Sequence, residues 1–150
     1  MTRLAAHGLA VGLPSGWEGR IQKRVATVAV EQTHAVVHLA NFALPEDRDD
    51  FGGGVTPAMR SPDVFVVLFE YGPDALGRPL FAARGIPRVT AAMFGSKRLQ
   101  RPLPGQLGCQ QFFTANGRAF CLYVVAGSRA YLARTVAQVN AMLADLDVSP

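Results

Sequence analysis

The sequence predicts a single α+β domain over residues 1–150, in which a mostly antiparallel sheet of five to seven strands is packed by a long C-terminal helix. Three observations lead to this prediction. The chain has 150 residues, 49% of them hydrophobic, which is enough for one core without a metal ion or a disulfide. Asn116 and Gly117 separate two runs rich in β-branched and aromatic residues, as in a β-hairpin. Residues 129–146 repeat apolar side chains at spacings of three and four, as in an amphipathic helix.

The N-terminal part is expected to consist of strands. Residues 8–13 predict a short strand, because the turn-forming residues 14–16 follow it directly. Residues 17–30 contain alternating and β-branched positions and predict a strand or a pair of strands. Residues 33–43 predict a buried strand, since both alternating sets of side chains are largely apolar.

An acidic, glycine-rich loop is expected over residues 44–54. Thr56 and Pro57 then predict the N-cap and first residue of a helix. That helix is limited to one turn, because Pro62 excludes helical backbone at the residue before it. Residues 63–71 form an apolar run that predicts a strand.

The pattern is weakest over residues 79–106. Residues 81–83 and 89–94 are interpreted as short strands, and residues 95–106 as a basic loop interrupted by proline and glycine. The sequence alone does not define the path of this segment.

The hairpin around Asn116 and Gly117 has a register set by its two-residue loop. It places Cys109 and Cys121 on opposite faces of the sheet, so no disulfide is predicted between them. The predicted cross-strand pairs are Ala115 with Arg118, Phe113 with Phe120, Phe112 with Cys121 and Cys109 with Val124.

The C-terminal helix is expected to be capped by Ser128 and to lie across the sheet. One apolar stripe should face the core. Its members are Leu132, Val136, Val139, Leu143 and Leu146.

Charge is distributed unevenly along the chain. The formal net charge is +4, and residues 75–144 contain nine bases and no acid. Such an imbalance favours an anionic partner when the fold gathers the bases, and only keeps the protein in solution when it scatters them. Thirteen of the fifteen bases are arginine, and Ala, Gly, Pro and Val are abundant, which indicates a GC-rich bacterial, and specifically actinobacterial, genome.

Catalytic motifs are missing from the sequence. It contains no G-x-S-x-G, H-E-x-x-H, C-x-x-C or S-x-x-K pattern. His34 and His38, with Glu31 upstream, have the spacing of helical zinc ligands, but on a strand the two rings would lie about 13 Å apart. Cys121 lies within an apolar run, where a thiol is expected to be inert. We therefore predict no catalytic residue, no cofactor and no metal.

Two loop features have compositions found in ligand sites. The acidic cluster lacks the alternation and distal glutamate of an EF-hand, so we interpret it as a solvated loop. Its members are Glu46, Asp47, Asp49 and Asp50. Residues 52–54 are three glycines without the spacing or the lysine of a phosphate loop. We expect them to permit positive φ or close backbone contact instead.

Residues 8–17, GLAVGLPSGW, resemble the opening of PsbP-like proteins, whose first strand has the form Gly-x-x-(apolar)-x-(apolar)-Pro-x-x-Trp. The strand and helix at the C-terminus, ending in Leu143, Leu146 and Val148, are also similar to the close of that superfamily. The resemblance implies an antiparallel sheet flanked by helices. It also implies a role in binding proteins or assembling complexes, and it transfers no functional residue.

The favoured function is a non-catalytic interaction or assembly module that contacts an acidic partner protein. Two alternatives stay open: a small-ligand-binding protein or enzyme with a pocket between sheet and helix, and a weak nucleic-acid binder. A homo-oligomer is compatible with each. We expect a cytoplasmic protein without a membrane span, a secreted one being the alternative. The predicted partner-binding residues are Arg84, Arg88, Phe94, Lys97, Arg98 and Arg101.

Overall fold

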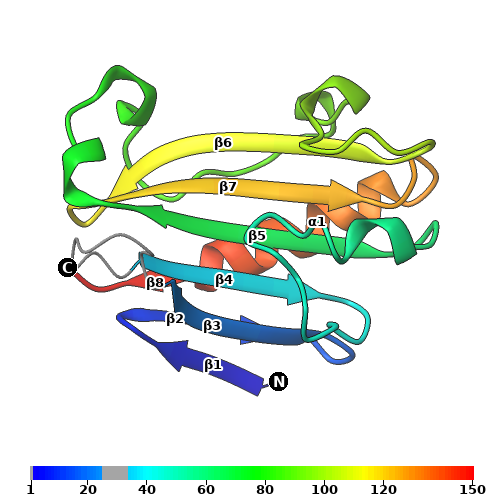
Figure 1. Cartoon of the computed structure of the whole chain (residues 1–150), viewed down its shortest axis with the longest axis horizontal. Coiled ribbons are helices and arrows are strands. Elements are labelled where there is room, and N and C mark those ends of the chain that lie inside the picture. Colours follow the sequence, from blue (N-terminus) through cyan, green and yellow to red (C-terminus); the bar gives the residue numbers. More distant parts are fainter. Residues whose placement is uncertain (1, 25–33) are drawn as a thin grey trace.

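The computed structural model describes residues 2–24 and 34–150, which form two antiparallel sheets and one α-helix (Figure 1). The larger sheet has five strands in the order β3-β4-β5-β7-β6, and the smaller has three in the order β1-β2-β8. The α+β class and the C-terminal helix are thereby confirmed, with eight described strands rather than five to seven. The elements are β1 (Thr2–Ala6), β2 (Leu9–Leu13), β3 (Glu18–Arg24), β4 (His34–Ala40), β5 (Val64–Tyr71), β6 (Leu107–Ala115), β7 (Arg118–Ala126), α1 (Leu132–Asp145) and β8 (Asp147–Val148).

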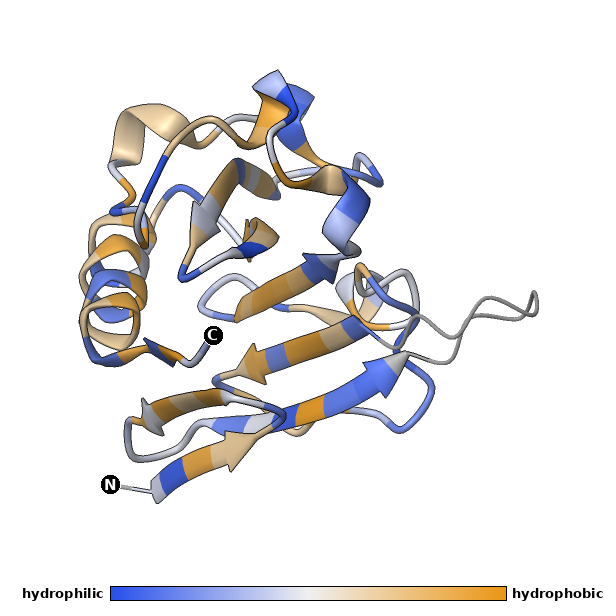
Figure 2. Cartoon of the chain, turned by 90° about the vertical axis from the view of Figure 1, so that its left-hand side faces the viewer, coloured by the Kyte–Doolittle hydropathy of each residue, from blue (hydrophilic) through white to orange (hydrophobic). Residues whose placement is uncertain are grey.

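The five-stranded sheet is covered on both faces. Helix α1 and the small sheet cover one face, where Val66, Leu122 and Met142 belong to the same core cluster. The segment 41–59 crosses the other face in front of β3 to β5, over Phe65 and Val67 (Figure 1). Figure 2 shows hydrophobic residues along the strands between these two covers. Double coverage explains why β4 and β5 read as continuous apolar runs rather than as alternating ones.

Helix α1 follows the predicted apolar stripe but is shorter than expected. It has 14 residues, and Leu132, Val139 and Leu143 of the stripe are buried. The predicted cap is wrong, because Tyr131 occupies the N-cap position without a side-chain hydrogen bond. The Ser128 hydroxyl instead donates to the Ser61 carbonyl at 2.9 Å, so it joins two loops.

The hairpin β6–β7 has the predicted register in all four pairs. Cys109 faces the α1 side of the sheet and Cys121 the opposite side. Asn116 and Gly117 both have positive φ, as the tight turn requires. This hairpin is therefore the part of the fold that the sequence defines most completely.

The predicted strands 17–30 and 33–43 correspond to β3 and β4. Residues 25–33, including Glu31, lie outside the described residues. His34 and His38 are both on β4 and share one face of the strand, as the strand interpretation requires. A further strand, β1, pairs with β2 through a turn at His7 and Gly8 that the sequence analysis did not identify.

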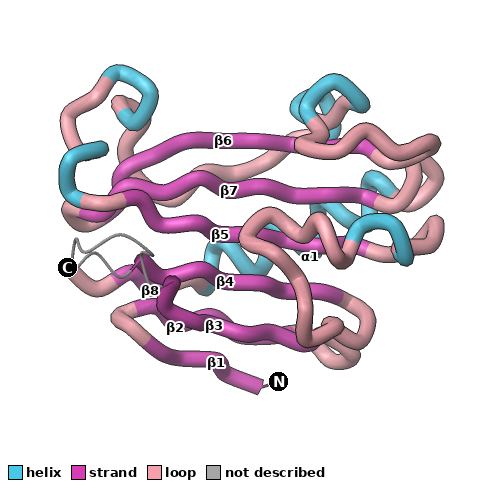
Figure 3. Tube along the Cα trace, in the orientation of Figure 1, coloured by secondary structure: helices cyan, strands magenta, loops and turns pink. Residues whose placement is uncertain are grey.

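Residues 79–106 differ from the sequence interpretation. The predicted strands at 81–83 and 89–94 are wrong, since the segment contains short 3-10 turns at Pro79–Phe81, Ala91–Met93 and Ser96–Arg98 (Figure 3). The turn at Thr56–Ala58 is also a 3-10 turn. Its predicted cap is wrong too: Val55 holds the N-cap position, and Thr56 is the first residue of the turn.

Candidate interaction site

The five predicted basic residues are all exposed, whereas the predicted aromatic contact is wrong. Phe94 is only 6% exposed and belongs to the core cluster beneath α1. The apolar surroundings of its ring exclude it from a contact surface. The exposed bases are Arg84, Arg88, Lys97, Arg98 and Arg101.

Strand β6 forms one edge of the five-stranded sheet, and segment 79–106 touches this edge only near its two ends. At one end the Thr114 N–H donates to the Ala83 carbonyl, and the Gly85 N–H donates to the Thr114 carbonyl, both at 2.8 Å. At the other end Gly95 and Gly108 exchange two hydrogen bonds of 2.9 Å. Figure 1 shows the chain extending beyond β6 at both ends of the strand.

Between these ends the segment leaves the edge and turns toward α1. The Val89 N–H donates to Asn140 Oδ1 at 2.8 Å, and Asn140 Nδ2 donates to the Val89 carbonyl at 2.9 Å. Val89 is 1% exposed, and its packing against the core holds the segment under the sheet. The middle of β6 is therefore not covered by the segment that protects its ends.

The outward backbone groups of Gln110 and Phe112 lie in this uncovered part. In an antiparallel strand, alternate residues direct N–H and C=O to the same neighbour. Gly108 and Thr114 direct theirs outward, so Gln110 and Phe112 do as well. Among residues 2–24 and 34–150, none forms a backbone hydrogen bond with these four groups. Both residues are half-buried.

Three of the five predicted bases lie at the two ends of this edge. Arg84 lies beside Thr114, while Lys97 and Arg98 form the turn packed against Gly108. A Cβ on Gly108 would lie 2.9 Å from the Arg98 carbonyl oxygen, which shows how closely that turn approaches the strand. The two ends are six residues, or about 20 Å, apart. These three bases thus flank β6 instead of forming one patch.

The other two predicted bases are placed differently. Arg88 directly precedes Val89, the residue whose backbone bonds to Asn140 of α1. Arg101 Nη1 donates to the Gly53 carbonyl at 3.4 Å, on the side of the sheet covered by segment 41–59. Arg78, which the sequence analysis did not select, lies 3.5 Å from Asp74 in an exposed pair. Within the described part of the chain, Arg84, Lys97 and Arg98 have no ion pair.

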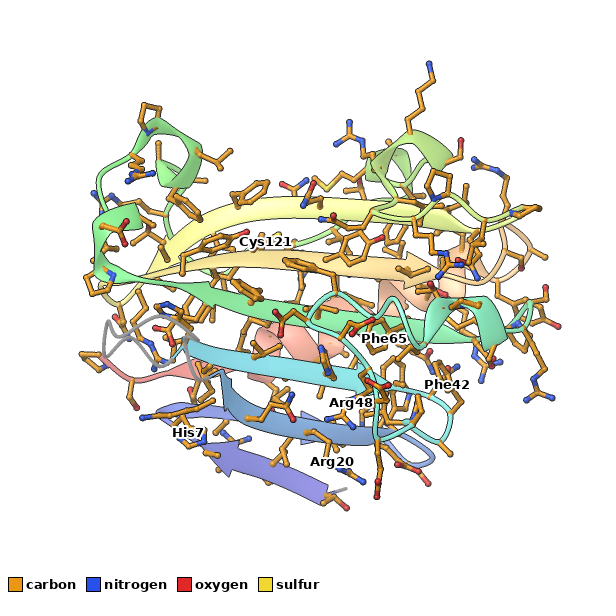
Figure 4. All side chains as sticks on the ribbon, in the orientation of Figure 1. His7, Arg20, Phe42, Arg48, Phe65 and Cys121 are labelled. Carbon is orange, nitrogen blue, oxygen red and sulfur yellow. The ribbon has the colours of Figure 1, made fainter. Side chains whose placement is uncertain are left out.

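A buried polar network fixes segment 41–59 to the sheet. Arg48 Nε donates to His38 Nδ1 at 3.0 Å, and His38 Nε2 lies 2.7 Å from the Asp50 carbonyl oxygen. Arg48 also donates to the Pro45 carbonyl and to Gln22 Oε1. Figure 4 shows the Arg48 side chain in front of strands β3 and β4. Because Arg48 carries only donors, Nδ1 must accept, and the ring proton lies on Nε2. The network requires a neutral His38.

The acid sensitivity of the fold should reflect this network. Burial lowers the pKa of His38 below 6.5, and the Arg48 charge lowers it further, against a raising effect of the Asp50 carbonyl. The folded protein then binds a proton at His38 less readily than the unfolded chain. We expect the free energy of unfolding to fall as the pH decreases from about 6.5 through the lowered pKa. Urea unfolding at a series of pH values measures this slope.

His38→Gln is the control for that measurement, because glutamine does not titrate. Its slope between pH 6.5 and 5 should be shallower than that of the wild type. Equal slopes in the two proteins would show that His38 does not contribute.

The acidic loop contains one buried side chain, Arg48, which its charged composition does not predict. Arg48 is 9% exposed, whereas Glu46, Asp47 and Asp49 around it are exposed. The expectation of a fully solvated loop is therefore wrong for Arg48, the arginine at its centre. The only signal was a single base within an acidic run, next to a strand that carries a histidine.

Both cysteines are buried thiols. Burial raises the pKa of Cys109 and of Cys121 to about 11. Each thiol therefore stays protonated near neutral pH, and a protonated thiol is a poor nucleophile.

The space between sheet and helix is too small for a ligand. The cavity there has a volume of about 20 Å³ and is lined by apolar residues such as Val66, Leu122 and Met142. A larger hollow of about 350 Å³ lies between segments 49–56 and 100–101, beside Tyr123. Thr56 lines it, and the buried Thr56 Oγ1 and Gln106 Oε1 have no hydrogen-bond partner among the described residues.

Comparisons with protein-family models, with curated proteins and with solved structures found no match. The resemblance to PsbP-like proteins therefore stays a prediction. No helix in the described ranges is long and apolar enough to cross a membrane.

Proposed function

We propose that this protein is a non-catalytic interaction module that binds an acidic partner protein along the β6 edge. The observation that carries the proposal is the placement of Arg84 at one end of an uncovered strand edge and of Lys97 and Arg98 at the other. A negatively charged partner would be attracted to both ends of the edge, and a positively charged one would be repelled. Unlike the space beneath α1, this edge is open to a macromolecule.

The exposure of Arg84, Lys97 and Arg98 and their lack of ion pairs within the described ranges favour a role in binding over a role in stabilising the fold. Surface ion pairs contribute little to stability, and Arg84, Lys97 and Arg98 form none within the described ranges. Their charges are therefore available to a partner. Charge of this kind acts mainly on specificity and on the rate of association.

Charge reversal tests the proposal. The probe is a synthetic peptide of five residues with one glutamate at each end of a Thr-Val-Thr sequence, which spans ~17 Å when extended and so fits within the ~20 Å between the two ends. We expect Lys97→Glu combined with Arg98→Glu to weaken its binding about tenfold or more, as measured by calorimetry at low salt.

The matched control is Arg129→Glu combined with Arg134→Glu, which changes the net charge equally at exposed positions outside the site. It should bind nearly as the wild type does. Equal weakening by both pairs would overturn the proposal, because only net charge would then matter. Tighter binding of a poly-uridine oligonucleotide than of the peptide, lost steeply with salt, would favour the nucleic-acid alternative instead.

A further inference from the structure

We infer that the partner binds as an extended segment that adds a strand to the free edge of β6. This inference rests on the proposed function and specifies how the same site recognises its partner. The uncovered groups are the N–H and C=O of Gln110 and of Phe112. A strand laid beside β6 would satisfy all four with backbone hydrogen bonds, which give affinity without requiring a particular side chain.

The geometry at the two ends of β6 allows an isolated strand to be added but excludes a second copy of the chain. Residues 83–85 and Gly95 already occupy the position of a neighbouring strand next to Thr114 and Gly108. The turns Pro79–Phe81 and Ser96–Arg98 extend from those positions (Figure 3). If the β6 edges of two copies paired, the turns of one copy would collide with the same turns of the other, because both edges carry them. An isolated extended segment fits between them.

The same geometry defines the chemistry of the segment. Its central residues lie beside Gln110 and Phe112, and the half-buried Phe112 ring, 5.6 Å from the Phe81 ring, offers them an apolar contact. Its two ends reach Arg84 on one side and Lys97 with Arg98 on the other. The expected ligand is therefore a short β-forming stretch with acidic residues at both ends.

The backbone contact is tested by Gln110→Pro. Proline removes the outward N–H and places its ring where the added strand would lie, and an edge strand tolerates proline at such a position. With the peptide described above, we expect Gln110→Pro to weaken binding more than tenfold. Gln110→Thr retains the N–H and should bind as the wild type does.

A second measurement uses only the wild-type protein and so does not depend on the folding of a variant. On saturation with the peptide, the amides of Gln110 and Phe112 should exchange with solvent at least tenfold more slowly. The Gln111 amide, which bonds to β7, should keep its rate, since it is already protected.

The outcomes separate this inference from the proposed function. Charge-dependent binding with equal affinity for Gln110→Pro and Gln110→Thr, and unchanged amides, overturns strand addition and leaves the acidic partner standing. If the Lys97→Glu and Arg98→Glu variant binds the peptide as tightly as the wild type does, both the strand addition and the proposed acidic partner are overturned. A dimeric wild type that Gln110→Pro makes monomeric would assign the edge to a second copy, and would also overturn the inference.

Discussion

Replacement of Arg118 by methionine is expected to lower the free energy of unfolding by about 3 kcal/mol, the usual cost of leaving one charge of a buried pair unpaired. Arg118 Nε and Nη2 donate to the two carboxylate oxygens of Glu70 at 2.7 and 2.8 Å. The side chains are only 14% and 16% exposed. Arg118 also donates to the carbonyls of Ser149 and His7, so one guanidinium joins three parts of the chain. Urea unfolding monitored by circular dichroism measures the loss.

The double substitution Arg118→Met with Glu70→Gln is the control for this effect. Removing both charges avoids the uncompensated carboxylate, so the double variant should be more stable than Arg118→Met alone. If the double variant loses as much as the sum of the two single variants, the pair is not coupled and the explanation is wrong.

Gly52→Ala should also destabilise the protein by about 3 kcal/mol, because two costs combine at this position. Gly52 has a φ of +79°, which a residue with a Cβ rarely adopts. Its Cβ would also overlap the Phe65 ring, which is fully buried beneath segment 41–59. Thermal unfolding should show a correspondingly lower midpoint.

Gly105→Ala separates the two costs of Gly52→Ala. Gly105 has a φ of +80°, but nothing lies within 4 Å of a Cβ built there. Only the backbone cost applies, so we expect a loss of about 1 kcal/mol. Similar losses at both positions would show that contact with Phe65 contributes little.

The success of the sequence interpretation depended on how local the determining interactions are. The β6–β7 register follows from Asn116 and Gly117, because a two-residue turn fixes every pair in the strands that it joins. The stripe of α1 is likewise a property of its own residues. Strand β1 was missed because its burial is uneven and its stability comes from pairing with β2, which no local pattern reveals.

The errors occur where contacts are distant in the sequence. Phe94 sits in a basic, polar stretch, and only its position beneath the sheet makes it part of the core. Arg48 lies among carboxylates, yet it is buried against His38, which belongs to a different element. For the candidate site, the sequence identified the exposed bases. It could not show that they flank an unpaired strand edge, because this depends on where the segment around Val89 leaves β6 for α1.

The small sheet has a consequence for the order in which the chain folds. Leu9 of β2 pairs with Val148 of β8, at opposite ends of the described chain, and Ser149 N–H donates to the Gly8 carbonyl. Because β2 and β8 are far apart in the sequence, a long stretch of chain must be closed into a loop before they can pair, and such pairings form slowly. The β3–β4, β5 and β6–β7 pairings involve shorter separations and can form earlier. We therefore expect the small sheet to close last, after the strands of the five-stranded sheet have paired.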